Sequence, residues 1–135
     1  MSKQLNVLIV DDSLIMRKNL SRNLEILGHH IVAEAKDGQE SIDLYKLHQP
    51  DLVTMDITMP GMDGITALEK IIQIDSASNI IMVTSHGQES MVMKALKAGS
   101  KGYILKPVTP DKLRESIGRI FSELADDHEE ELLDE

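Results

Sequence analysis

The sequence contains no cysteine and no tryptophan, and only 2% of its 135 residues are aromatic. The absence of cysteine excludes disulfides and thiolate metal sites, and it is compatible with a reducing compartment. With so few aromatic residues, the core must be built from aliphatic side chains. The remaining composition, 41% hydrophobic and 27% charged, is typical of a globular protein, and the length fits one domain.

Long apolar runs and basic stripes are also missing. The N-terminal stretch MSKQLNVLIVDD holds an apolar run that is too short for a signal-peptide core or a membrane span, so we expect a cytoplasmic protein without a membrane partner. Phosphate backbones are bound by lysine and arginine clusters, so nucleic acid is not an expected partner.

The negative charge is concentrated at one end. Residues 125–135, ADDHEEELLDE, carry seven acids and no lysine or arginine, out of a formal net charge of −9. We interpret residues 1–124 as a single domain and 125–135 as an acidic C-terminal tail, either a solvated extension of the last helix or, through Leu132 and Leu133, a docking segment.

Strand-like and helix-like segments alternate along the chain. Buried parallel strands are predicted by the apolar runs NVLIV (6–10), DLVTM (51–55), NIIMVT (79–84) and GYILK (102–106), and more weakly by HIVAEA (30–35). Helical spacing of apolar residues separates them, and Gly28, Gly99 and the pair Thr109–Pro110 mark helix ends. Five such units predict an α/β fold, a doubly wound parallel sheet with helices on both faces.

Polar residues follow the ends of the four strongest strands. Asp11 and Asp12 follow the first, Asp56 follows LVTM, Thr84 ends IIMVT, and Lys106 follows GYIL. In open α/β sheets, ligands bind at the carboxyl ends of the strands. A carboxylate can attack phosphorus, and Lys106 and Thr84 are groups that stabilise a transferring phosphoryl group. Because Asp56 stands alone at its strand end, we predict that it is the nucleophile.

These residues resemble the response-regulator receiver domain family, in particular its single-domain chemotaxis members of the CheY type. The motifs VDDS, MDITMPGMDG, TS and KP carry the resemblance, which covers approximately residues 4–124. It implies a flavodoxin-like fold of five parallel strands in the order 2-1-3-4-5 with five helices. That order brings Asp11, Asp12 and Asp56 into one crevice.

Three ionised carboxylates repel one another in a small site, at about 4 kcal/mol for each pair 4 Å apart at an effective dielectric constant near 20. A divalent cation with oxygen ligands, Mg²⁺, would relieve this repulsion, and without it at least one acid should have a raised pKa. The resemblance implies that Asp12 and Asp56 bind Mg²⁺ through their side chains and Thr58 through its backbone carbonyl, while Asp11 acts mainly through water.

The resemblance also implies how the protein would switch. Asp56 would be phosphorylated by a sensor histidine kinase, and Lys106 would contact the phosphoryl oxygens. Thr84 would move toward the phosphoryl group, Tyr103 would turn inward, and the Lys106–Pro107 bond would be cis. His86 and Thr58 occupy positions that the family links to the lifetime of the phosphorylated state.

Structural alternatives exist for several of these residues. Asp12 or Ser13 is also suited to cap the first helix, and Asp63 to cap the helix that follows the MPGMDG turn. Tyr103 also suits an ordinary strand position. We interpret His29 and His30 as loop residues rather than metal ligands. We assign Met91, Met93 and Ala95 to core packing rather than to a partner surface.

The predicted function is a stand-alone response regulator, most consistent with chemotaxis. Its expected partners are the chemotaxis kinase, a flagellar motor switch protein or similar target, and a phosphatase, with the chain acting as a monomer and not as an enzyme beyond its own phosphorylation and dephosphorylation. One alternative is a phosphorelay intermediate. Another is an aspartate-nucleophile phosphatase, but the second acid of its DxD motif is replaced by Thr58.

Overall fold

The computed structural model describes residues 3–85 and 87–121, which form five strands and five helices in alternation. The strands are β1 (Asn6–Val10), β2 (His30–Ala35), β3 (Leu52–Met55), β4 (Ile80–Thr84) and β5 (Gly102–Leu105). The helices are α1 (Leu14–Ile26), α2 (Gly38–His48), α3 (Gly64–Ile74), α4 (Glu89–Ala98) and α5 (Pro110–Ile120). All five predicted strands are confirmed, including the weakest.

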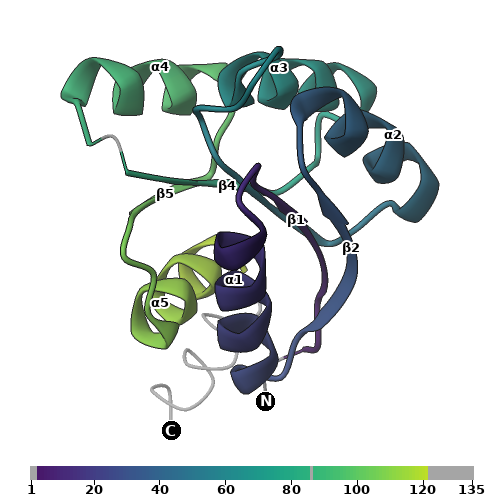
Figure 1. Cartoon of the computed structure of the whole chain (residues 1–135), viewed down its shortest axis with the longest axis vertical. Helices are drawn as coiled ribbons and strands as arrows, with labels where there is room; N and C mark the ends of the chain where they lie inside the picture. Colours follow the sequence, from purple (N-terminus) through teal and green to yellow (C-terminus); the bar gives the residue numbers. More distant parts are fainter. Residues whose placement is uncertain (1–2, 86, 122–135) are drawn as a thin grey trace, which may run out of the picture.

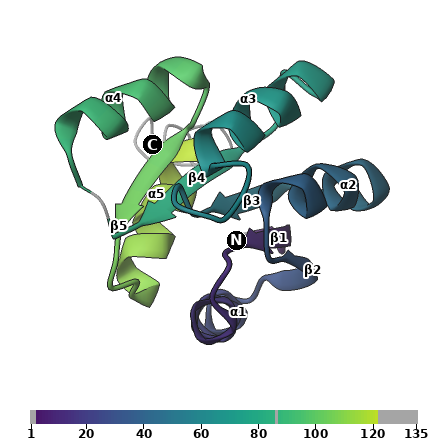
Figure 2. The ribbon, with the colours of Figure 1, turned by 45° about the horizontal axis from the view of Figure 1, so that its top comes forward.

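The strands form one parallel sheet in the order β2-β1-β3-β4-β5, as the resemblance implied. Helices α2, α3 and α4 cover one face of the sheet, and α1 and α5 cover the other (Figure 1). The turned view shows the sheet between these two layers (Figure 2). The direction in which successive strands are added to the sheet reverses between β1 and β3. In doubly wound sheets, ligands bind at such a point of reversal.

The two faces of the sheet carry separate hydrophobic clusters. Along β1, Leu8 and Val10 pack with α2, α3 and α4, whereas Val7 and Ile9 pack with α1 and α5. Successive side chains of a strand point to opposite faces, so a strand covered on both sides is apolar throughout. This explains the unbroken apolar runs, and aliphatic side chains dominate both clusters as expected.

Short polar side chains cap the starts of α1, α3 and α5. Ser13, not Asp12, caps α1 by accepting a hydrogen bond from the Met16 N–H at 3.3 Å. Asp63 caps α3 and Thr109 caps α5 in the same way, as predicted. The left-handed residue Gly99 ends α4 at a φ of 117°, a conformation that favours glycine.

The interpretation of the α4 residues as core was wrong for one of them. Ala95 is fully buried and Met91 packs against the larger cluster, but Met93 is 46% exposed. The helix lies at the surface, so its apolar residues cannot all face inward. His29 is a structural residue, buried with its Nδ1 accepting a hydrogen bond from the Leu5 N–H at 3.1 Å.

Strand β5 lies at one edge of the sheet, and a lysine from α5 binds backbone carbonyls at its C-terminal end. The Lys112 Nζ donates hydrogen bonds to the Leu105 carbonyl at 3.1 Å and to the Pro107 carbonyl at 2.9 Å. The Ser100 hydroxyl donates to the Gly102 carbonyl at 2.6 Å. Side chains thus satisfy backbone oxygens along a strand that has a neighbour on one side only.

Two predictions concern residues outside the described ranges. These are the acidic tail at 125–135 and the position of His86, so the boundary at residue 124 stays a prediction. Within residues 3–85 and 87–121, the helices are all too short or too polar to cross a membrane.

Candidate functional site

The structure brings the three predicted acids together. Asp11 and Asp12 follow β1, and Asp56 follows β3, the neighbouring strand in the sheet. Each contributes a carboxylate oxygen to a cluster in which these atoms lie within 4.8 Å of one another. Asp11 is 1% exposed and Asp56 is 6% exposed, whereas Asp12 faces solvent. The cluster therefore opens outward on the side of Asp12.

The Asp11 carboxylate is held in place by two donors. Its Oδ2 accepts a hydrogen bond from the Lys106 Nζ at 2.9 Å, and its Oδ1 accepts one from the Ser13 N–H at 2.9 Å. A buried charge needs such partners, because desolvation without them costs several kcal/mol. Lys106 follows β5, the strand on the other side of β4 from β3. Of its two ion pairs with the acids, the one with Asp11 is the shorter.

Lys106 also lies 3.7 Å from Asp56, measured from Nζ to Oδ2. Its side chain is 15% exposed, and its N–H donates to the Thr84 carbonyl at 2.8 Å, which extends the pairing of β4 and β5. The Lys106–Pro107 peptide bond is cis, as the resemblance implied. The ammonium group is thereby placed between Asp11 and Asp56, where it can contact a group bound to either.

Burial raises the pKa of the Asp56 carboxyl above its usual value. The positive charge of Lys106 lowers this pKa, but the negative charges of Asp11 and Asp12 raise it, so that the net direction is upward. We expected at least one raised pKa in a cluster without metal, and this is confirmed for Asp56. Burial is the largest of these influences, and the neighbouring acids add to it.

A glycine allows the backbone of the Asp56 loop to approach α3. A Cβ at Gly64 would lie 1.9 Å from the Asp56 carbonyl oxygen and 2.9 Å from the Ile57 Cα. The Gly64 N–H instead donates a hydrogen bond to the Ile57 carbonyl at 2.7 Å. The sequence shows this glycine only as the last residue of the MPGMDG turn, and a single sequence does not reveal that two backbones approach each other here.

The remaining predicted residues lie around the same crevice. Thr84 is fully buried at the end of β4, and Thr58 is exposed two residues after Asp56. Tyr103 on β5 is half-buried against the larger cluster, and its pKa is raised by burial and by the negative charge of Asp56. The structure thus places Thr84, Tyr103 and Thr58 as predicted in the fold, and their roles stay predictions.

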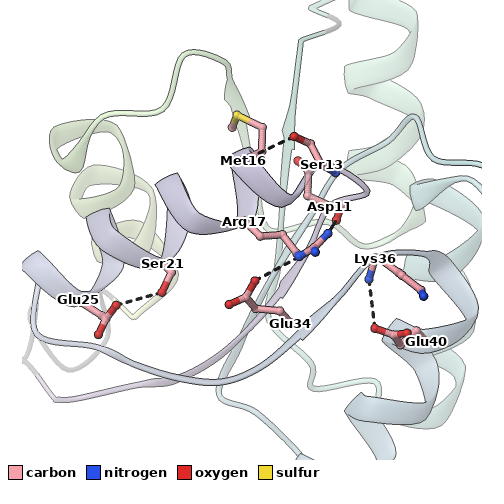
Figure 3. Close-up of polar contacts among 9 residues, drawn as sticks. All are labelled: Asp11, Ser13, Met16, Arg17, Ser21, Glu25, Glu34, Lys36 and Glu40. Atoms are coloured by element: carbon pink, nitrogen blue, oxygen red, sulfur yellow. Dashed lines mark hydrogen bonds and ion pairs between the residues drawn. The ribbon is translucent and has the colours of Figure 1, made fainter.

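One contact in this region was missed by sequence reasoning. Arg17 on α1 donates from Nη1 to the Asp11 carbonyl oxygen at 2.7 Å and from Nε to Glu34 on β2 at 3.2 Å (Figure 3). The two partners are distant in sequence from each other, so only the strand register brings them together. An arginine one helical turn after the acids and an acid near the end of β2 were the available signals.

The donor set fits a hard divalent cation. Carboxylate oxygens are the ligands that Mg²⁺ and Ca²⁺ prefer, and the outward opening at Asp12 leaves room for water and a further ligand. The three carboxylates face one ammonium group, that of Lys106, so an added positive charge would offset the repulsion between them. The residues present are therefore chemically suited to a metal site.

Comparison with known proteins identifies relatives of this chain. The sequence matches the response regulator receiver domain family over residues 7–118. It is 50% identical to the chemotaxis protein CheY of Bacillus subtilis over 116 residues, which span 86% of this chain and 97% of that protein. It is 43% identical to CheY of Thermotoga maritima over 114 residues, 84% of this chain and 95% of that protein.

Solved structures share the fold. A crystal structure of a CheX–CheY–BeF₃–Mg²⁺ complex from Borrelia burgdorferi superposes with a TM-score of 0.83 at 41% identity, covering 86% of this chain and 88% of that chain. A LuxR-family two-component response regulator from Aurantimonas gives a TM-score of 0.84 at 37% identity, with 89% and 86% covered. The similarity extends over nearly all of the described residues.

Proposed function

The chain belongs to the response regulator receiver domain family, and on that premise we propose that it is a stand-alone cytoplasmic response regulator phosphorylated on Asp56. The single observation that carries the proposal is the position of Asp56, buried beside two acids with the Lys106 Nζ 3.7 Å away. The CheY relatives, matched over nearly their whole length, support a role in chemotaxis.

The side chains account for the chemistry of the transfer. An oxygen of the Asp56 carboxylate forms a bond to phosphorus while the bond between phosphorus and the imidazole nitrogen of a phosphohistidine breaks, and the leaving imidazole takes up a proton. Lys106 would move its contact from Asp56 to the phosphoryl oxygens and hold their charge. Thr84, buried at the adjacent strand end, would supply a hydroxyl to the same group.

Mg²⁺ is the cofactor that we propose for this step. Asp12 and Asp56 would bind it through carboxylate oxygens and Thr58 through its backbone carbonyl, with Asp11 acting through water. When bound, the ion would neutralise the clustered carboxylates and the phosphoryl oxygens. The CheX–CheY complex from Borrelia burgdorferi that contains BeF₃ and Mg²⁺ supports the choice of Mg²⁺ as the cofactor.

We propose that the phosphorylated protein acts on a protein target rather than turning over a small substrate. The residue two positions after Asp56 is Thr58, which lacks the acid that a phosphatase of this chemistry would use. The face formed by α4, β5 and α5 exposes Met93, Leu96 and Leu105, each more than 40% accessible, which suits a protein contact. Phosphorylation would shift the population of the state that binds the target.

Intact-protein mass spectrometry tests the proposal. The wild-type protein incubated with Mg²⁺ and acetyl phosphate should gain about 80 Da, the mass of one phosphoryl group, in a form that is labile. Asp56→Asn should abolish the gain. Asp63→Asn is the matched control, because Asp63 lies in the same loop but is exposed and caps α3, a role that asparagine also fulfils.

Two results would contradict the proposal. One is the absence of any labile adduct on wild-type protein to which Mg²⁺ binding has been shown by calorimetry. The other is an adduct that persists in Asp56→Asn, which would move the acceptor to another residue.

A further inference from the structure

The backbone of Asp11 is tied to strand β2 at both of its polar atoms. Its N–H donates a hydrogen bond to the Ala35 carbonyl at 3.0 Å, which continues the ladder between β1 and β2 beyond Val10. Its carbonyl oxygen accepts a bond from the Arg17 Nη1 at 2.7 Å, and the Arg17 Nε is bonded to Glu34 of β2 at 3.2 Å (Figure 3). The Val10–Asp11 peptide is therefore held through its N–H, and the Asp11–Asp12 peptide is held through its carbonyl oxygen by Arg17.

The guanidinium group is suited to this double contact. Its planar fork presents several N–H donors at fixed angles, so one group can bind a carbonyl and a carboxylate at once. Arg17 is also the better buried partner, with a side chain 15% exposed against 37% for Glu34. Glu34 stands opposite Ile9 in the register of β1 and β2, which places its carboxylate beside the start of α1. The sheet thus supplies a rigid anchor for the arginine.

The Asp12 carboxylate depends on this backbone anchor. Within residues 3–85 and 87–121, its oxygens have no hydrogen bond or ion pair, and the residue is exposed. The backbone on either side of Asp12 then positions its carboxylate relative to Asp11 and Asp56: Arg17 holds the preceding peptide at the Asp11 carbonyl, and the Ser13 N–H of the following peptide is bonded to the Asp11 carboxylate. Metal affinity depends strongly on such pre-positioning, because every ligand that must first be ordered costs conformational entropy.

Charge alone would give Arg17 the opposite effect. A guanidinium group beside three carboxylates repels a second cation, and Glu34 offsets only part of that repulsion. If Arg17 acted through its charge, its removal would strengthen cation binding. If it acts through position, its removal would weaken cation binding. The sign of the effect therefore distinguishes the two roles.

We propose that Arg17, anchored on Glu34, is a positioning residue that fixes the Asp11–Asp12 peptide and thereby sets the affinity of the site for its divalent cation. The inference rests on the proposed function, in which these acids hold Mg²⁺. Residues behind metal ligands typically change metal affinity by about 10- to 100-fold when they are replaced.

Isothermal titration calorimetry with Mg²⁺ on the unphosphorylated full chain is the test. Arg17→Met, which keeps an unbranched apolar stem but loses the charge and the donors, should raise the dissociation constant about tenfold. The double variant Arg17→Met/Glu34→Gln, with the same net charge as wild type, should bind as weakly as the single one. Arg22→Met is the matched control, because it removes the same charge from an exposed position on the same helix.

A second measurement separates positioning from general stability. Urea unfolding without Mg²⁺ shows whether each variant is folded at the temperature of the titration. Arg17→Lys retains the charge but cannot donate to the Asp11 carbonyl and to Glu34 in the same geometry, so its dissociation constant should lie between those of the wild type and Arg17→Met. This conservative variant keeps the test decisive should Arg17→Met fail to fold.

Three results would overturn the inference. One is Mg²⁺ binding by Arg17→Met that equals or exceeds that of Arg22→Met, and another is an affinity of Arg17→Lys equal to the wild type. Both leave the proposed function intact, since the wild type still binds the ion. A wild-type chain that takes up no Mg²⁺ would overturn the proposed metal site and this inference together.

Discussion

Replacing Gly64 by alanine should disturb both the stability of the fold and the position of Asp56. The added Cβ would lie 1.9 Å from the Asp56 carbonyl oxygen and 2.8 Å from its carbon, where ordinary contacts begin at 3.4 Å. The obstacle is backbone, which cannot rotate away as a side chain can. The start of α3 and the loop after β3 would have to separate by about 1.5 Å at this point.

The size of the effect follows from two opposing contributions. Alanine is more favourable than glycine within a helix by about 1 kcal/mol, and by less in the first turn. Overpacking of a close contact costs about 1 to 3 kcal/mol, and a contact between backbones should lie at the upper end of that range. We therefore expect Gly64→Ala to lower the free energy of unfolding by about 2 kcal/mol, a large share of the stability of a small domain.

Urea unfolding followed by far-UV circular dichroism measures this change, since the chain has no tryptophan for fluorescence. Gly118→Ala in α5 is the matched control, because nothing lies within 4 Å of the position of its added Cβ. This variant should be more stable than the wild type by about 0.5 to 1 kcal/mol. The reasoning is refuted should Gly64→Ala show the same gain as Gly118→Ala, or the same stability as the wild type.

Other regions of the molecule give three more expectations. Asp12→Asn removes one of three clustered charges, so it should raise the free energy of unfolding without metal by about 1 kcal/mol. Calorimetry should show that the variant binds Mg²⁺ more weakly. A loss of stability would contradict the idea that the three carboxylates repel one another. Tyr45→Phe should cost about 1.5 kcal/mol in urea unfolding, because the buried phenol donates a 2.8 Å hydrogen bond to Asp75, and no change would mean that the bond contributes nothing. Burial lowers the pKa of His29, so folding favours its neutral form, and that contribution is present above the unfolded pKa of 6.5 and is lost as the pH falls below it. Urea unfolding between about pH 7 and pH 5 should show this loss in the wild type and much less of it in His29→Asn, and equal slopes would exclude the histidine as its source.

The fold was predictable because the three central strands, β1, β3 and β4, are covered on both faces. Runs such as those around Leu8 and Ile81 are apolar at every position, and polar turn residues set their ends. Capping by Asp63 and Thr109 was equally predictable from the sequence, since a cap depends on residues three positions apart. The strand order was not contained in these local signals, and it came from the family resemblance.

The site was predictable in its members but not in its supporting contacts. The acids and Lys106 stand at strand ends, so the topology alone brings them together. The bond from Arg17 to the Asp11 carbonyl depends on a helix orientation, and its anchor on Glu34 depends on the register of β2. The close approach at Gly64 likewise depends on how α3 docks. Such contacts arise from packing between segments, which a single sequence does not specify.

Lys112 of α5, which binds the backbone carbonyls at the end of β5, affects how the protein behaves at high concentration. An edge strand offers backbone groups to any strand of another molecule, and such pairing between molecules can begin aggregation. Lys112 already occupies the Leu105 and Pro107 carbonyls and places a charge beside them, so an incoming strand would have to displace its hydrogen bonds and bury its ammonium group. We therefore expect this edge of the sheet not to pair with strands of other molecules. Aggregation through this edge should then be suppressed in concentrated solutions of the protein.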